Sequence, residues 1–103
     1  MKKNIALFGG SGGLGTLLTP LISEKYNVIP LSSKDVDITS VVELKNFFNT
    51  NVVDIVINLS GYNHDALLHK ISDWEEVDKM LGINITGNVK LLSQSLPQMR
   101  ERG

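Results

Sequence analysis

The chain has 103 residues, of which 42% are hydrophobic and 20% charged, a composition typical of a globular domain rather than a disordered or fibrous chain. Ten basic residues against eleven acidic ones give a net charge of -1, so bulk charge predicts no affinity for nucleic acid or for an anionic membrane. The lack of cysteine excludes disulfides, thiolate metal sites and a cysteine nucleophile.

The first apolar run, residues 5–8, is followed at once by glycines. It is too short for a signal peptide or a membrane-spanning helix, so we expect a cytoplasmic protein. Such a run is typical of a buried parallel strand. Apolar residues at helical spacing then predict a helix over residues 13–25, in which Pro20 is expected to produce a kink or an open turn.

The middle of the chain predicts two short strands, a helix and a further strand. The strands are expected over residues 27–32 and 36–38, although Pro30 is awkward in a strand that pairs on both sides. The connection between them is too short for a crossover helix. A capping-box pattern at Ser40 and Glu43 predicts the start of the helix. Residues 53–59 are mostly apolar and β-branched, which predicts the clearest strand.

A second capping-box pattern, Ser72 and Glu75, predicts a long helical stretch from about residue 73 to residue 100. Glycines and Pro97 within it predict a bend, and Trp74 is expected to pack in the core. The element order predicts an α/β fold with a Rossmann-like doubly wound parallel sheet, in three αβα layers with about four strands, as a single domain over residues 1–103. The buried stripe of the long helix is expected to consist of Val77, Met80, Leu81, Ile85, Val89, Leu92 and Leu96.

The glycine-rich turn after the first strand is the most informative segment. It contains both Gly10-x-Gly12-x-x-Gly15 and Gly9-x-x-x-Gly13-x-Gly15, between a predicted strand and a predicted helix. Glycine permits positive φ in a tight turn and lets backbone amides approach a diphosphate at the helix N-terminus. A P-loop is excluded, because it would need Lys where Thr16 stands. The alternative to a dinucleotide-binding turn is a merely flexible turn. The predicted diphosphate-binding residues are Gly9, Ser11, Gly12, Gly13, Leu14 and Gly15.

Four further segments carry a family resemblance. Asn58-Leu59-Ser60-Gly61 resembles the Asn-Asn-Ala-Gly signature of short-chain dehydrogenases/reductases, and Asp37-Ile38 resembles the pair that contacts adenine in that family. The run Ile83-Asn84-Ile85-Thr86-Gly87 is similar to the family's Val-Asn-Leu-x-Gly, and residues 96–100 resemble the end of its fourth helix. The resemblance spans essentially the whole chain in the family's order.

The resemblance implies hydride transfer between a nicotinamide dinucleotide and a small carbonyl or alcohol substrate. It implies that Asp37 and Ile38 contact the adenine, that Asn58, Leu59, Ser60 and Gly61 line the nicotinamide side, and that Asn84 is the catalytic Asn of a proton relay. The family's Ser and Tyr-x-x-x-Lys lie beyond the fifth strand, and neither Tyr26 nor Tyr62 has a Lys four positions later. We therefore expect a domain truncated before its catalytic segment, inactive alone and weak in cofactor binding.

The end of the second strand bears on cofactor choice. Ser32, Ser33 and Lys34 can accept a 2′-phosphate, which favours NADP, whereas the nearby Asp35 would favour NAD if the loop brings it to the ribose. We expect no metal site, with His64 and His69 as surface or packing residues. The resemblance also implies a homo-oligomer at full length, formed through the helices around residues 77–96.

Two other functions stay open. One is a non-catalytic dinucleotide-binding or scaffolding module that functions at this length. The other is a sugar-nucleotide-modifying relative of the extended branch of the family, which the short connection between the second and third predicted strands resembles.

Overall fold

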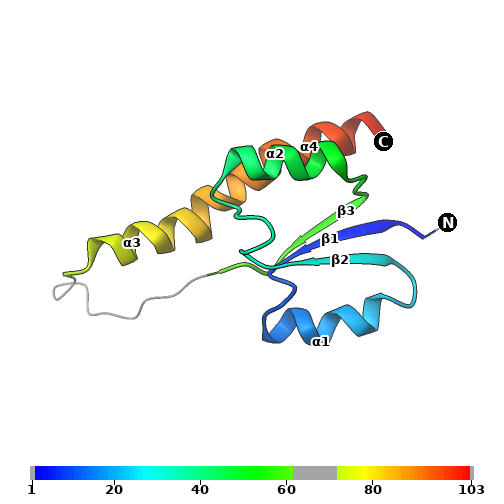
Figure 1. Cartoon of the computed structure of the whole chain (residues 1–103), viewed down its shortest axis with the longest axis horizontal. Helices are drawn as coiled ribbons and strands as arrows, with labels where there is room; N and C mark the ends of the chain where they lie inside the picture. The colour runs from blue at the N-terminus through cyan, green and yellow to red at the C-terminus, as the bar shows by residue number, and fades with distance from the viewer. Residues whose placement is uncertain (1, 62–71, 103) are drawn as a thin grey trace.

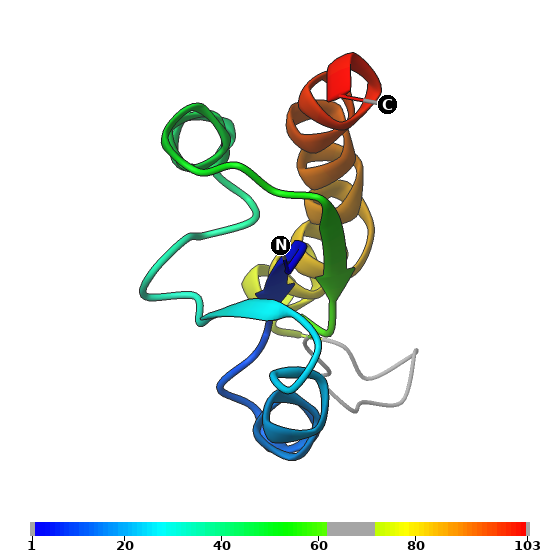
Figure 2. The same ribbon diagram turned by 90° about the vertical axis from the view of Figure 1, so that its right-hand side faces the viewer.

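The structure is a computed structural model that describes residues 2–61 and 72–102. Its sheet has the parallel strand order β2-β1-β3. The helix α1 covers one face of the sheet, whereas α2 and α4 cover the other (Figures 1 and 2). The predicted three-layer α/β fold with a parallel sheet is thus confirmed. The elements that form the layers are β1 (Asn4–Phe8), α1 (Gly13–Ile22), β2 (Asn27–Leu31), α2 (Val41–Thr50), β3 (Ile55–Asn58) and α4 (Gly87–Arg102).

The strand predicted over residues 36–38 does not form, so the sheet has three strands in the described residues rather than about four. The backbone amide of Val36 donates to the Ser32 carbonyl, and the Asp37 carboxylate accepts from the Thr39 amide at 2.9 Å and from its hydroxyl at 2.7 Å. These local bonds make a turn in place of a ladder. The apolar pattern that suggested a strand reflects burial instead.

Pro30 lies inside β2, and the sheet order explains why it is tolerated. β2 is an edge strand that pairs with β1 alone, so one side of its backbone needs no ladder hydrogen bonds. The helix predicted over residues 13–25 ends earlier, at Ile22, two residues after Pro20. Pro20 removes one amide donor from the last turn of α1.

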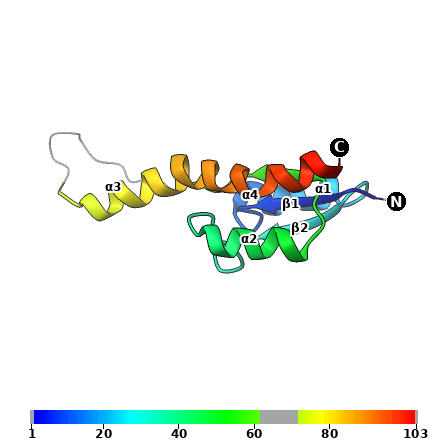
Figure 3. The same ribbon diagram turned by 90° about the horizontal axis from the view of Figure 1, so that it is seen from above.

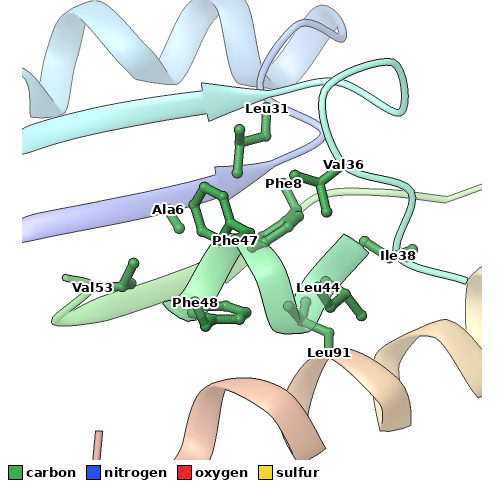
Figure 4. Packing of buried hydrophobic residues seen from close by; sticks show 10 residues of the cluster. All are labelled: Ala6, Phe8, Leu31, Val36, Ile38, Leu44, Phe47, Phe48, Val53 and Leu91. Atoms are coloured by element: carbon green, nitrogen blue, oxygen red, sulfur yellow. The ribbon is translucent and has the colours of Figure 1, made fainter. Parts of the chain in front are cut away.

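The main core lies between the sheet and the pair α2–α4 (Figure 4). Phe8 packs edge-on against Phe47, with ring centroids 5.8 Å apart, and Phe47 packs in the same way against Phe48 at 5.1 Å. The core consists of Ala6, Phe8, Leu31, Val36, Ile38, Leu44, Phe47, Phe48, Val53 and Leu91.

The predicted capping box of α2 forms one of its two hydrogen bonds. The Ser40 side chain accepts from the Glu43 amide, whereas the Glu43 carboxylate accepts from the Asp37 amide.

The predicted long helix is divided by a π-helical turn, η2 (Gly82–Thr86), between α3 (Trp74–Leu81) and α4. α3 begins one residue later than the capping box predicted, because Asp73 rather than Ser72 is the cap, accepting from the Glu76 amide. α3 extends beyond the end of the sheet (Figures 1 and 3). It contains no buried residue, and Trp74, predicted to be a core anchor, is 64% exposed.

The buried stripe predicted for the long helix is wrong for α4. Its buried residues are Gly87, Leu91 and Ser95, which face the core. The sequence pattern selected the apolar residues one position away, on a face that no described element covers. The members of the predicted stripe that are exposed in the structure are Leu81, Ile85, Val89, Leu92 and Leu96.

Candidate functional site

The turn between β1 and α1 is held by backbone contacts that require glycine at three positions. Gly9 has φ of +79°, and a Cβ on it would lie 2.8 Å from the Leu59 carbonyl carbon. A Cβ on Gly10 would lie 2.8 Å from the Pro30 side chain, and one on Gly15 would lie 2.6 Å from the Gly10 backbone. These glycines therefore serve the packing of the first βα unit against its neighbouring strands.

Gly12 and Gly13 differ, because the protein's own packing does not require them to be glycine. A Cβ on Gly13 would have no neighbour within 4 Å, and one on Gly12 would have only the Gly9 carbonyl oxygen, at 3.4 Å. Both residues are exposed at the start of α1. This helix has neither a side-chain cap nor an acidic residue in its first turn. Its N-terminal amides and the partial positive charge there are suited to an anion.

A cavity of about 380 Å³ lies beside this turn. Because the strands are parallel, the segments that leave their carboxyl ends meet at one edge of the sheet, and these segments form most of the wall. The remainder comes from α3 and η2. The lining residues are Gly9, Ser11 and Gly12 after β1, Ser32, Ser33, Val36, Asp37 and Ile38 after β2, Leu59, Ser60 and Gly61 after β3, and Lys79 and Ile83.

Most of the residues predicted from sequence are brought together by this cavity, but several are not in its wall. Gly13, Leu14 and Gly15 lie in the first turn of α1 beside it, and Leu14 is 62% exposed. Lys34 is on the exposed β2 loop. Ile38 does line the cavity, but it is only 5% exposed and also belongs to the core. The remaining predicted residues outside the wall are Asn58 and Asn84, which the Asn88 side chain connects by accepting from the Asn58 side chain and donating to the Asn84 backbone carbonyl.

Three lining residues were not predicted, namely Val36, Lys79 and Ile83. Lys79 and Ile83 are four positions apart, one helical turn, which places them on the same side of the α3–η2 segment. No local motif marks them, because their place in the wall depends on how this segment crosses the carboxyl ends of the strands. Val36 was assigned to a strand, and the turn that replaces the strand brings it to the cavity.

The loop after β2 has a preformed acidic anchor. The Asp35 carboxylate accepts from the Ser32 amide at 2.8 Å and from its hydroxyl at 3.0 Å, and the Lys34 amide donates to the same hydroxyl at 3.2 Å. The backbone and side-chain hydrogen bonds from Ser32 hold the pKa of Asp35 below its ordinary value. Ser32 thus uses its hydroxyl within the loop, and a negative charge stands beside it.

Asn84 lies in the π-helical turn, close to the segment that follows β3. Its side-chain oxygen would be 3.6 Å from a Cβ on Gly61. Within residues 2–61 and 72–102, no group of three or more His, Asp or Glu side chains could hold a metal ion. In the same residues, no helix is both long and apolar enough to cross a membrane. Tyr62, His64 and His69 lie outside the described residues.

Comparisons with known proteins agree with this geometry, although no family model matches the chain. Carbonyl reductase family member 4 of Xenopus tropicalis is 24% identical in an alignment that covers 96% of this chain and 51% of that protein. The chain therefore spans about half the length of the curated relative that it matches.

Solved structures of similar fold include reductases and dehydrogenases. A dTDP-4-dehydrorhamnose reductase of Clostridium acetobutylicum is 28% identical, with a TM-score of 0.76, over 93% of this chain and 33% of that one. A small-chain dehydrogenase in complex with NADPH is 20% identical, with a TM-score of 0.87, over 100% and 48%. A short-chain dehydrogenase of Leptospira borgpetersenii with bound NAD+ is also 20% identical, with a TM-score of 0.78, over 99% and 48%.

The parallel sheet, the glycine turn and these likenesses define the fold as Rossmann-like. The resemblance to the short-chain dehydrogenase/reductase family that the motifs indicated is confirmed as a likeness in sequence and fold.

Proposed function

We propose that the chain is the cofactor-binding part of an NAD(P)-dependent short-chain dehydrogenase/reductase, which transfers hydride between a nicotinamide dinucleotide and a small carbonyl or alcohol. One observation carries the proposal. Gly12 and Gly13 lack side chains where packing does not require it, beside an uncapped helix N-terminus and a cavity at the carboxyl ends of the strands. Absent side chains at that place leave room for a diphosphate to approach the backbone.

The order β2-β1-β3 supports an assignment of the two ends of the dinucleotide. The turn after β1 lies between the other two strand ends, so a diphosphate bound there extends one nucleoside toward β2 and the other toward β3. We assign the adenosine to the β2 side, with Asp37 and Ile38 at the adenine. The nicotinamide end is assigned to residues 59–61 and Asn84, as the family resemblance implies. When bound, the nicotinamide ring carries the hydride.

The proposed cofactor is NADP, with Ser33 and Lys34 as ligands of the 2′-phosphate. The anchor formed by Asp35 favours NAD as the alternative, because its carboxylate stands beside Ser32 and would repel a phosphate there. The solved structures of similar fold include an NADPH-bound and an NAD+-bound protein, so they support a nicotinamide dinucleotide in either form.

The test is a titration of the chain with NADPH and, separately, NADH, followed by nicotinamide fluorescence. We expect weak binding, so the titration extends to about 1 mM, which corresponds to a binding free energy of about -4 kcal/mol. The variant Gly12→Ala should weaken binding about tenfold or more, a loss of about 1.4 kcal/mol, because its Cβ lies at the cavity wall. Its stability should be unchanged or higher, since Ala lowers the entropy of the unfolded chain.

The matched control is Asn49→Ala, on the exposed surface of α2 away from the cavity. Binding to this control should equal binding to the unmodified chain. A Gly12→Ala protein that is folded and binds both dinucleotides as well as the control would contradict the proposed role of the glycine turn.

A sugar-nucleotide substrate is the second candidate, because the dTDP-4-dehydrorhamnose reductase is the structural likeness of higher sequence identity, 28% against 20%. The connection from β2 to α2 also lacks a helix. Saturation-transfer NMR with dTDP, in the presence of NADPH, separates the two substrate classes. A dTDP signal supports the sugar-nucleotide branch, whereas its absence with NADPH bound supports a small carbonyl or alcohol.

The non-catalytic module is a third reading, and it shares the binding step. Extending the reading frame past residue 103 would separate it from the enzyme. A Ser followed about a dozen residues later by Tyr-x-x-x-Lys would supply the family's general acid/base and favour the enzyme.

A further inference from the structure

A chain of hydrogen bonds between asparagine side chains joins β3 to the π-helical turn. The Ser60 amide donates to Oδ1 of Asn58 at 2.9 Å, and Nδ2 of Asn58 donates to Oδ1 of Asn88. Nδ2 of Asn88 then donates to the backbone carbonyl of Asn84 at 2.8 Å. All of these groups are partly buried. The chain of bonds therefore runs without a break from one wall of the cavity to the segment that forms another.

The two ends of this chain fix the orientation of both side-chain amides. The Ser60 amide can only donate, and the Asn84 carbonyl can only accept. Asn58 must therefore present its oxygen to Ser60 and its nitrogen to Asn88, and Asn88 must present its nitrogen to Asn84. A carboxylate at position 88 could accept from Asn58 but could not donate to Asn84, so it would leave two acceptors facing each other.

The bonds hold two parts of the site that have no covalent link nearby. Ser60 and Gly61 line the cavity after β3, and Ile83 of η2 lines it from the helical side. A π-helical turn is a rare insertion that tends to persist at functional positions. Here the Asn88 side chain, at the start of α4, donates to a backbone carbonyl of the turn and accepts from Asn58 at the end of β3. It therefore ties the turn to the end of β3.

We propose that Asn88 is a positioning residue for the nicotinamide half of the dinucleotide. Through Asn58 it orients the Ser60–Gly61 backbone, and through the Asn84 carbonyl it holds the π-helical turn at the same end of the cavity. It acts through these neighbours rather than on the cofactor itself. The inference rests on the proposed function, and it adds a residue that no motif of the sequence had marked.

The test compares two ligands that differ only at the nicotinamide end, NADPH and 2′-phospho-ADP-ribose. Binding of each to the chain, wild type and Asn88→Asp, is measured by isothermal titration calorimetry. We expect Asn88→Asp to weaken NADPH about tenfold, the effect of one strong hydrogen bond, and to change 2′-phospho-ADP-ribose by less than about twofold. The control Asn49→Asp adds the same charge on the exposed face of α2 and should change neither ligand.

Asn88→Ala serves as a second variant in case the carboxylate prevents folding, which circular dichroism reports. Deuterium exchange at the Ser60 amide gives a measurement without ligand, and both variants should accelerate it. Equal weakening of the two ligands would show a purely structural role and overturn the inference, as would no change in either. If the wild type binds 2′-phospho-ADP-ribose but the variants do not alter NADPH, the proposed function survives and this inference fails. If the wild type binds neither of these ligands nor NADH, both fail.

Discussion

Asp35 shows how a single side chain can fix the conformation of the loop after β2, where we propose that the ribose binds. Its carboxylate accepts from both the amide and the hydroxyl of Ser32, and these bonds lower its pKa. A lowered pKa in the folded state means that the carboxylate stabilises the loop at pH values above the ordinary aspartate pKa. This contribution is lost as the pH falls through the lowered folded value, below roughly pH 4.

We predict that Asp35→Asn shifts cofactor preference toward NADPH. An amide keeps the shape of the side chain and removes the charge that would repel a 2′-phosphate. The ratio of the NADH to the NADPH dissociation constant should therefore rise severalfold, as measured in parallel titrations at neutral pH. The Ser32 amide resonance should move with pH in the unmodified chain and stay constant in Asp35→Asn. An unchanged ratio would show that Asp35 does not face the ribose.

The glycine motif does not show which of its glycines the packing of the fold requires. All five glycines between residues 9 and 15 match the fingerprints, yet Gly9, Gly10 and Gly15 are required by backbone contacts within the fold. Only Gly12 and Gly13 have room for a Cβ atom. The spacing predicted the turn correctly. Which of its glycines the packing requires depends on how closely neighbouring backbone segments approach the turn.

The helix α4 is the element for which sequence and structure differ most. Its apolar residues lie on two sides of the helix, and the periodicity of the sequence indicated the wrong side as the buried one. Leu91 is buried at 2% exposure and packs on the core, whereas its neighbour Leu92 is 51% exposed. Gln98 confirms which face is inward, because its side chain donates to the carbonyls of Phe48 and Asn51 and accepts from the Val53 amide.

We predict that Leu91→Ala and Leu92→Ala have unequal effects on stability. Removing the buried Leu91 side chain should lower the free energy of unfolding by about 2–5 kcal/mol, the range for leucines in a packed core. Leu92→Ala should change it by less than about 0.5 kcal/mol, as is usual for surface sites. Urea denaturation followed by circular dichroism measures both. A larger loss for Leu92 would mean that the other face of α4 is the packed one.

At the scale of the whole molecule, the described residues leave apolar surfaces uncovered. The radius of gyration is 15.2 Å. A compact chain of this length would have about 13 Å. β3 lies at one edge of the sheet and pairs with β1 alone among the described residues, so the backbone along its outer edge can pair with another strand. One face of α1, with Leu14, Leu17 and Leu21, is 62–74% exposed.

We predict that the isolated chain associates with itself. Apolar stripes on α1 and α4 and an open strand edge each favour pairing of copies. Sedimentation velocity should show species larger than a monomer at concentrations of tens of micromolar or less. The charge-introducing variant Leu92→Glu, on the exposed stripe of α4, should reduce their fraction, and Lys45→Glu on α2 is the control. A sharp monomer boundary for the unmodified chain would contradict this prediction.

The sequence by itself determined the class of fold and the position of the glycine turn, because a strand, a glycine run and a helix in succession are local features that short-range sterics enforce. It also determined the family resemblance, which several separated motifs carried together. Tertiary structure alone decided which face of α4 is buried, that Lys79 and Ile83 reach the cavity, and that Asn88 bonds to Asn58. Each of these depends on which distant segments approach one another, and periodicity and local propensity contain no information about that approach.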